Sequence, residues 1–151
     1  ENDKHRGDGM LIEQILKTKG GNVLTIDASQ TLAEAARFLD EERIGAVVAM
    51  SGEGLAGVLS ERDILRQLAR HGAAALQMSV EESMTRGVIT ANPTESLDQC
   101  LGRMTDRRVR HLPVMRDGKL AGIVSIGDLV KWKIEETRAE ADAMADYIKG
   151  Q

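Results

Sequence analysis

The sequence predicts an α/β fold made of two similar β-α-β-β-α units that pack about a pseudo-twofold axis, with a C-terminal helix after them. The main observation is an internal repeat without gaps, in which residues 23–66 match residues 88–131 at one constant offset. In each repeat, short apolar runs alternate with stretches that have apolar residues at helical spacing. A gapless repeat of this length is typical of two copies of one structural unit.

The identical positions of the two repeats fall in the predicted strands and at the predicted helix ends. The identical pairs are Val23/Val88, Thr25/Thr90, Leu32/Leu97, Arg43/Arg108, Met50/Met115, Leu55/Leu120, Ala56/Ala121, Gly57/Gly122, Ser60/Ser125 and Asp63/Asp128. Many of the remaining pairs, including those in the predicted strands, place an apolar residue opposite an apolar residue, so we expect the same core in both units.

The elements of the first unit follow from apolar periodicity and from turn residues. We expect a helix at Met10–Lys17, a strand at Val23–Thr25, a helix at Leu32–Glu42, a hairpin of strands Gly45–Met50 and Leu55–Ser60, and a helix at Asp63–Arg70. An alanine-rich join, His71–Gln77, leads to the second unit.

The second unit repeats this order. We expect a strand at Val88–Thr90, a helix at Leu97–Thr105, a hairpin of strands His111–Met115 and Leu120–Ser125, and a last helix from Asp128 to Lys149. A short helical stretch precedes each unit, Ile12–Leu16 before the first and Val80–Met84 before the second. Cys100 matches Ala35 on an apolar helix face, which predicts a buried small residue.

Composition narrows the functional class. The chain has 151 residues, of which 42% are hydrophobic and 29% charged, as in an ordinary globular protein. Its net charge of −4 and its 2% aromatic content argue against nucleic-acid binding. No apolar run approaches the roughly 18 residues of a membrane span. The single cysteine cannot form an internal disulfide, which favours a reducing cytoplasm.

A Ser-x-x-Asp motif follows the last strand of each unit and opens a helix, as Ser60/Asp63 and as Ser125/Asp128. A helix N-terminus suits a phosphate, and the aspartate could accept hydrogen bonds from a sugar diol. The glycine three residues before each serine would let a ligand approach the strand backbone. The same spacing is also that of a capping box, in which serine and aspartate bond only to the helix start. The spacing alone leaves both interpretations open.

These stretches resemble the cystathionine-β-synthase (CBS) domain. The resemblance is carried by Val109–Val114, Asp117-Gly118 and Leu120–Val130 in the second unit, and by Ile44–Val48, Gly57–Asp63 and Glu82–Thr85 before it. It implies a stand-alone pair of CBS repeats packed sheet to sheet, known as a Bateman module. We therefore divide the chain into a disordered or vector-derived tail (1–9), repeat 1 (10–75), repeat 2 (76–135) and a helical extension (136–151).

Modules of this family bind adenosine-containing ligands, among them AMP, ADP, ATP, NAD and S-adenosylmethionine, in two clefts between the repeats. The resemblance implies that Asp63 and Asp128 bind ribose. It also implies supporting nucleotide-binding positions, namely Thr25, Gly45, Ala46, Val47, Ser60 and Arg62 in the first repeat, and Thr90, Arg110, His111, Leu112, Pro113, Ser125 and Gly127 in the second.

The two clefts are not equivalent, because Arg110 stands where the first repeat has Gly45. We expect the Asp128 cleft to be the tighter nucleotide site, since Arg110 would donate charge-assisted hydrogen bonds to a phosphate. Lys17 and Lys19 stand beside Gly20-Gly21 and could reach a phosphate, but we expect them in a solvated turn.

The sequence therefore predicts a non-catalytic, homodimeric sensor of energy or redox state that signals to a regulated protein of unknown identity. The alternative is a dimeric protein-interaction module with vestigial nucleotide clefts that docks through its C-terminal helix. The sequence shows no nucleophile–base pair, no zinc-ligand spacing and no Walker loop. We accordingly expect no enzymatic activity, no metal and no catalytic cofactor.

Overall fold

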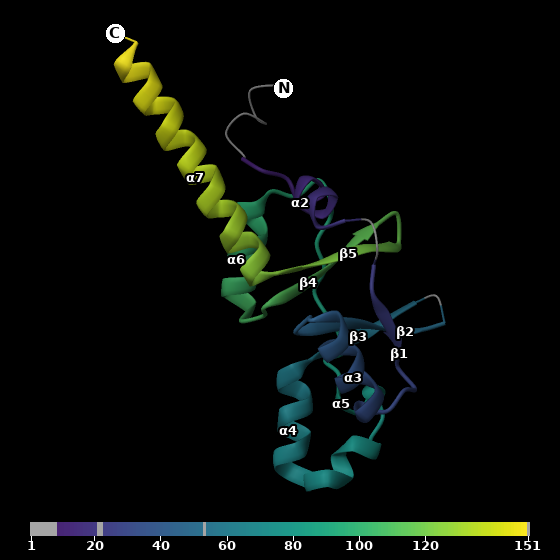
Figure 1. Cartoon of the computed structure of the whole chain (residues 1–151). Helices are drawn as coiled ribbons and strands as arrows, with labels where there is room; N and C mark the ends of the chain where they lie inside the picture. Colours follow the sequence, from purple (N-terminus) through teal and green to yellow (C-terminus); the bar gives the residue numbers. More distant parts are fainter. Residues whose placement is uncertain (1–8, 21–22, 53, 151) are drawn as a thin grey trace.

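The computed structural model describes residues 9–20, 23–52 and 54–150 and shows two α/β halves, one above the other in Figure 1, with helix α7 extending from the upper half. In chain order the elements up to the join are α2 (Ile12–Lys19), β1 (Thr25–Asp27), α3 (Leu32–Glu42), β2 (Ala46–Ser51), β3 (Gly54–Ser60), α4 (Glu61–His71) and the 3-10 helix η1 (Gly72–Gln77). The elements after the join are α5 (Val80–Ser83), α6 (Leu97–Arg107), β4 (His111–Arg116), β5 (Lys119–Ser125) and α7 (Ile126–Lys149). The first half is formed by β1 to α4 and the second by α6 to α7. The expected tail at 1–9 lies outside the described residues except for its last glycine.

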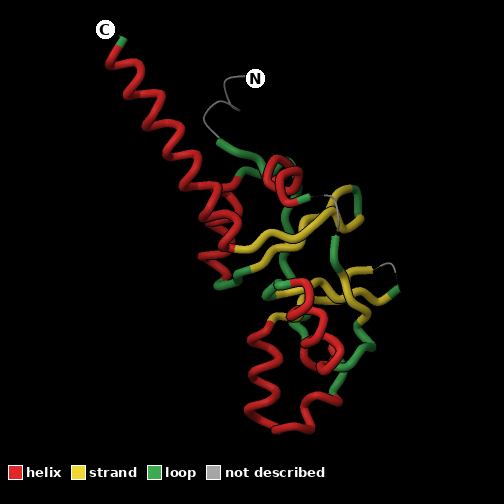
Figure 2. The backbone as a smooth tube through the Cα atoms, in the orientation of Figure 1, coloured by secondary structure: helices red, strands yellow, loops and turns green. Residues whose placement is uncertain are grey.

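Each half is built on a β-hairpin, as the sequence predicts. In the first half β1 runs parallel to β2, with Thr25 opposite Val48, and β2 pairs antiparallel with β3. In the second half β4 pairs antiparallel with β5, with His111 opposite Ser125. Figure 2 shows the two sheets facing each other between the helices.

The strand expected at Val88–Thr90 is wrong. The segment makes one isolated parallel bridge, between Ala91 and Val114. Both prolines of the chain lie at this contact, and neither has an N–H to donate. In the first half Ala28 donates to the carbonyl of Met50 at 2.9 Å, whereas Pro93 takes its place in the second half. The missing donors stop the ladder after two hydrogen bonds.

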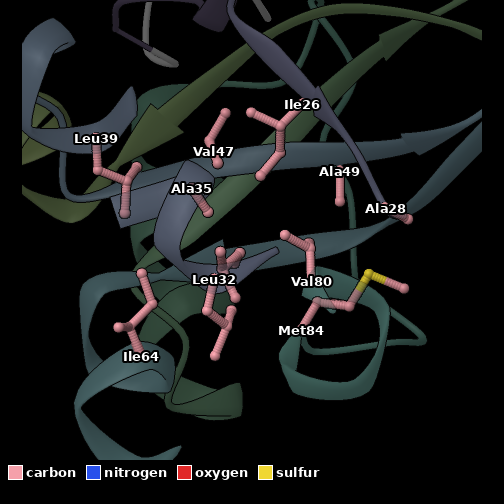
Figure 3. Close-up of a cluster of buried hydrophobic side chains, with 11 residues drawn as sticks. Ile26, Ala28, Leu32, Ala35, Leu39, Val47, Ala49, Ile64, Val80 and Met84 are labelled. Atoms are coloured by element: carbon pink, nitrogen blue, oxygen red, sulfur yellow. The ribbon is translucent and has the colours of Figure 1, made fainter. Parts of the chain in front are cut away.

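The short helices that precede the units exchange partners. The core of the first half contains Val80 from α5 and Met84 just after it, and Figure 3 shows Val80 close to Leu32. The core of the second half contains Ile12 and Ile15 from α2, both fully buried. Each half is therefore completed by the helix that precedes the other half in the sequence.

A third apolar cluster joins the two sheets. Its buried members are Ala46, Val48 and Val58, and the partly buried residues around it are Met50, Leu55, Val88, Leu120 and Ile123. Strands from both halves contribute, so the halves pack sheet to sheet. The predicted fold class is thereby confirmed.

Most predicted helices lie within a turn of their expected bounds, but α2 begins later and continues to Lys19, and the first strand is Thr25–Asp27 and not Val23–Thr25. Cys100 is fully buried in the second core, as its match with Ala35 predicts, and burial raises the pKa of its thiol to about 11.

Helix α7 is anchored only at its beginning. Leu129 is fully buried and Trp132 packs on the second core. From position 137 to position 150 every side chain is exposed, and Figure 1 shows this part pointing away from both halves. Glu135 and Arg138, one turn apart on this helix, form an ion pair at 3.8 Å. No helix among the described residues is long and apolar enough to cross a membrane.

Candidate functional site

A cavity of about 520 Å³ lies where the first Ser-x-x-Asp motif faces the second half of the molecule. Ser60 and Asp63, at the start of α4, form part of its wall. Arg110 and His111, at the start of β4, form another part, and Val88 supplies an apolar surface. The cavity combines an apolar wall with polar groups from several elements, which is typical of a small-molecule site.

Asp63 is fixed at the bottom of this site by a capping box. Its Oδ2 accepts a hydrogen bond from the Ser60 N–H at 2.9 Å, and its own N–H donates to Ser60 Oγ at 3.3 Å. Its Oδ1 pairs with Arg66 at 3.1 Å, and the Asp63 residue is only 6% exposed. The capping interpretation is therefore correct, but it uses mainly one carboxylate oxygen. The other oxygen is held only by a half-exposed arginine that a ligand hydroxyl could replace.

The cavity is strongly basic. Five arginines line it, against the two acidic residues Glu61 and Asp63: Arg62, Arg66, Arg107, Arg108 and Arg110. Arg66 forms an ion pair with Asp63, and within the described part of the chain the other four form none. Guanidinium groups without a protein partner at a helix N-terminus create a site for an anion.

Arg110, which the sequence analysis assigns to the Asp128 cleft, lies between the two motifs. The backbone carbonyl of Arg110 does accept a hydrogen bond from the Ile126 N–H at 2.8 Å, at the start of α7. However, Arg110 lines the cavity that contains Asp63, and Asp128 is not part of that lining. The cause is the sheet-to-sheet packing, which places the α6–β4 turn of the second half against the β3–α4 turn of the first.

Asp128 makes the same capping box but has an additional partner. Its Oδ2 accepts a hydrogen bond from the Ser125 N–H at 2.8 Å, and Lys19 Nζ lies 2.7 Å from the same oxygen. Lys19 also donates to the carbonyl of Ile123 at 2.9 Å. Burial opposes ionisation of Asp128, but the hydrogen bonds from Lys19 and Ser125 outweigh it and hold its pKa below the usual value. The expectation that Lys19 lies in a solvated turn is therefore wrong.

His111 stands between the two motifs. Burial lowers its pKa, with further lowering by the charges of Lys19 and Arg110, while Asp128 and Glu61 act in the opposite direction. The side chain is therefore a neutral hydrogen-bonding group at neutral pH.

Comparison with known proteins identifies the fold family. The family model described as "CBS domain" matches residues 12–70 and again residues 79–135. The chain belongs to the CBS domain family. It is 34% identical over 152 residues to a mitochondrial CBS domain-containing protein of Arabidopsis thaliana, covering 95% of this chain and 74% of the relative.

Solved CBS structures superpose on the chain. A CBS-domain containing protein from Agrobacterium tumefaciens is 40% identical, with a TM-score of 0.78 over 83% of this chain and 94% of that one. A CBS domain pair in complex with 5′-methylthioadenosine and S-adenosyl-L-methionine is 27% identical, with a TM-score of 0.73 over 82% of this chain and 95% of that one.

The structure brings together only some of the nucleotide positions that the CBS resemblance implies. Six line the cavity: Gly45, Ser60, Arg62, Asp63, Arg110 and His111. The others lie outside this cavity. Four are buried: Val47 and Leu112 in the two cores, Ala46 between the sheets and Pro113 in β4.

The remaining five lie at other places in the fold. Thr25 is exposed in β1, and the Thr90 carbonyl accepts a hydrogen bond from Arg103. Ser125, Gly127 and Asp128 lie at the start of α7.

Sequence reasoning missed Arg66, Arg107 and Arg108 as cavity residues. Arg108 has a left-handed backbone (φ 55°) and ends α6, as the identical Arg43 ends α3. The sequence signal was the run of arginines before β4 in the CBS pair, but it did not reveal which motif they face. Among the described residues, no three His, Cys, Asp or Glu side chains form a group that could hold a metal ion.

Proposed function

We propose that this CBS pair is a non-catalytic regulatory module that binds an adenosine nucleotide in the Asp63 cavity and signals energy or redox state to a partner protein. AMP, ADP, ATP and NAD are the candidate ligands. The observation that carries this proposal is the convergence on one cavity of a capped, buried carboxylate and four arginines that form no ion pair with any residue the structure describes. A volume of about 520 Å³ lies within the range of ligand pockets.

The proposed roles follow from the chemistry of each group. Asp63 Oδ1 accepts hydrogen bonds from the ribose diol, with Arg66 swinging aside. The apolar wall at Val88 and Ile89 contacts the base, and Arg62, Arg108 and Arg110 hold the phosphates. The adenosine ligands of the 27% identical CBS pair support an adenosine moiety.

The charge of the cavity favours anionic ligands. Because phosphates add negative charge, we expect affinity to rise from AMP to ADP to ATP, and we expect S-adenosylmethionine, whose sulfonium is positive, to bind more weakly.

Ligand binding would be coupled to a change of shape, because the cavity takes residues from both halves. A nucleotide that contacts Asp63 and Arg110 together favours the arrangement in which those elements are close. A partner that prefers the same arrangement would then bind the liganded module more tightly. We further propose a homodimer, and a reducing compartment such as the cytoplasm, which suits the buried free thiol of Cys100.

Calorimetric titration with AMP, ADP, ATP, NAD and S-adenosylmethionine tests this function. We expect nucleotide binding by the wild-type protein and a loss of affinity of about tenfold or more in Asp63→Asn, which keeps the shape of the capping group but removes its charge. Asp142→Asn, on the exposed part of α7, is the matched control and should bind like the wild type.

Two results would contradict the proposal. Unchanged affinity in Asp63→Asn would remove that carboxylate from the site, and no binding of any ligand by folded, nucleotide-free protein would favour the alternative. The alternative is a dimeric protein-interaction module, and the observation in its favour is the row of exposed side chains on α7.

A further inference from the structure

We propose that Lys19 closes the second cleft from within, so that this module binds nucleotide at the Asp63 cavity alone and has one site per chain. The inference rests on the proposed function, and it adds the stoichiometry and the residue that sets it. It concerns the side chain of Lys19 at the end of α2, which reaches across to the start of α7.

The contact places the Lys19 ammonium on the Asp128 carboxylate and on the adjoining strand at the second motif. Lys19 Nζ lies 2.7 Å from Asp128 Oδ2 and 2.9 Å from the carbonyl oxygen of Ile123. The same oxygen of Asp128 already accepts from the Ser125 N–H. The Asp128 side chain is 25% exposed and that of Lys19 36%, so the ion pair is partly shielded from water. A ribose diol must compete with a charged donor for this carboxylate.

The position that corresponds to Lys19 in the other half is Gly87, which has no side chain. Gly57 faces Met84 and Gly122 faces Leu16, so α5 and α2 approach their sheets at matching positions. Three residues beyond these contacts lie Gly87 after Met84 and Lys19 after Leu16. Gly87 lines the Asp63 cavity. The cavity is thus open where the chain has glycine, and the second motif is covered where it has lysine.

The equivalent strands β3 and β5 also differ in what their backbone carbonyls bind. In the first half, Val58 exchanges two backbone hydrogen bonds with Thr85, at 3.1 and 2.9 Å, and α5 has ended at Ser83. In the second half, the equivalent carbonyl is that of Ile123, and it accepts the Lys19 ammonium instead. The longer α2 carries Lys19 over the strand edge. Lys19 is the last residue of α2, so the greater length of this helix compared with α5 places the lysine at the second motif.

His111 lies close to the pair, because the charges of Asp128 and Lys19 both act on its pKa. Removing Lys19 would leave the partly buried Asp128 carboxylate at the start of α7, near His111, without its cationic partner. We infer that the loss of one amine converts the second motif into a nucleotide site.

The test compares wild-type protein, Lys19→Met and the control Lys17→Met, which alters an exposed lysine one half-turn away. Calorimetry with ATP gives the number of sites, and ¹³C NMR of the Asp128 carboxyl gives its titration without any nucleotide. Methionine keeps the aliphatic stem of Lys19 but cannot donate to Asp128. We expect one site in the wild type and in Lys17→Met, two sites in Lys19→Met, and a higher pKa of Asp128 only in Lys19→Met.

The outcomes separate the inference from the proposed function. Two sites in the wild type, or one site in Lys19→Met, would overturn the role of Lys19 and leave the Asp63 cavity intact. No site in the wild type and one in Lys19→Met would support Lys19 and refute binding at Asp63. No site in either protein would overturn both. An Asp128 pKa that Lys19→Met leaves unchanged would show that the ion pair does not form, and would also overturn the inference.

Discussion

The environment of His111 depends on how the two halves pack together. His111 starts β4 and lines the Asp63 cavity, and the charge of Asp128, at the start of α7, also acts on its pKa. Burial, Lys19 and Arg110 hold its pKa below the ordinary value of 6.5. As pH falls below this value the unfolded chain takes up a proton at His111 while the folded protein does not. The free energy of unfolding therefore falls between the unfolded and the folded pKa, and the loss is complete below the folded one.

His111→Gln should remove this contribution, because glutamine keeps a polar side chain that does not titrate. We expect the free energy of unfolding, measured by urea denaturation between about pH 5 and pH 7.5, to depend less on pH in His111→Gln than in the wild type. A wild-type curve that is flat over this range, or one that His111→Gln does not change, contradicts the lowered pKa.

Sequence alone could predict the Ser60/Asp63 part of the site, because the motif lies next to its own helix and is a local feature. It could not predict that Arg110 faces Asp63, because that contact joins segments from different repeats. Because the motif occurs twice, the sequence is compatible with Arg110 near Asp63 or near Asp128, and the packing of the halves determines which cavity it lines. For the same reason Lys19 was placed in solvent, although it pairs with a residue 109 positions later.

The glycines that precede the two serines, Gly57 and Gly122, are needed for helix packing and not for ligand access. Gly57 and Gly122 were expected to admit a ligand. A Cβ on Gly57 would lie 2.5 Å from the backbone oxygen of Thr85, and one on Gly122 would lie 2.7 Å from Leu16 Cδ2. The absent side chains admit α5 and α2, the helices that the two halves exchange.

Alanine at these positions should therefore act on stability, with a difference between the two halves. Gly57→Ala meets backbone, and we expect it to lower the free energy of unfolding by about 1–3 kcal/mol. Gly122→Ala meets the end of a flexible leucine and should cost less. Gly102→Ala lies within α6 with no atom near its added methyl, and we expect it to raise stability by about 0.5–1 kcal/mol. Equal losses in Gly57→Ala and Gly122→Ala, measured by urea denaturation, would show that the strand edges yield in the same way.

Most helices and both hairpins could be predicted from the sequence, because apolar spacing and turn residues determine them locally. The exchange of α2 and α5 could not, since each is a short amphipathic helix whose apolar face fits either core. The strand at Val88–Thr90 was expected because of its match with Val23–Thr25. Its failure depends on Pro93 and Pro113, which lack the N–H groups that the first half uses.

Helices α4 and α7 carry large apolar side chains that the packing within one chain leaves exposed. Both helices lie along one side of the molecule, at the left in Figure 1. Leu65 on α4 is 66% exposed, and Val130, its counterpart in the repeat, is 45% exposed on α7. Ile134 follows one turn later with 48% exposed. Large apolar side chains at equivalent positions of two helices indicate a self-complementary surface.

We expect this side to form the homodimer, with α4 and α7 of one chain packing on the same helices of a second. Light scattering coupled to size exclusion should then give the wild type twice the 16.4 kDa mass of the chain. Leu65→Glu combined with Val130→Glu should give a monomer, because a dimer would bury two charges per chain without partners.

Met144→Glu, on the part of α7 that points away from both halves, is the matched control and should stay dimeric. A monomeric wild type would refute the dimer, and a dimeric double variant would move the interface away from this side. Because the Asp63 cavity is complete within one chain, the monomeric variant should still bind nucleotide, so assembly and ligand binding can be measured separately.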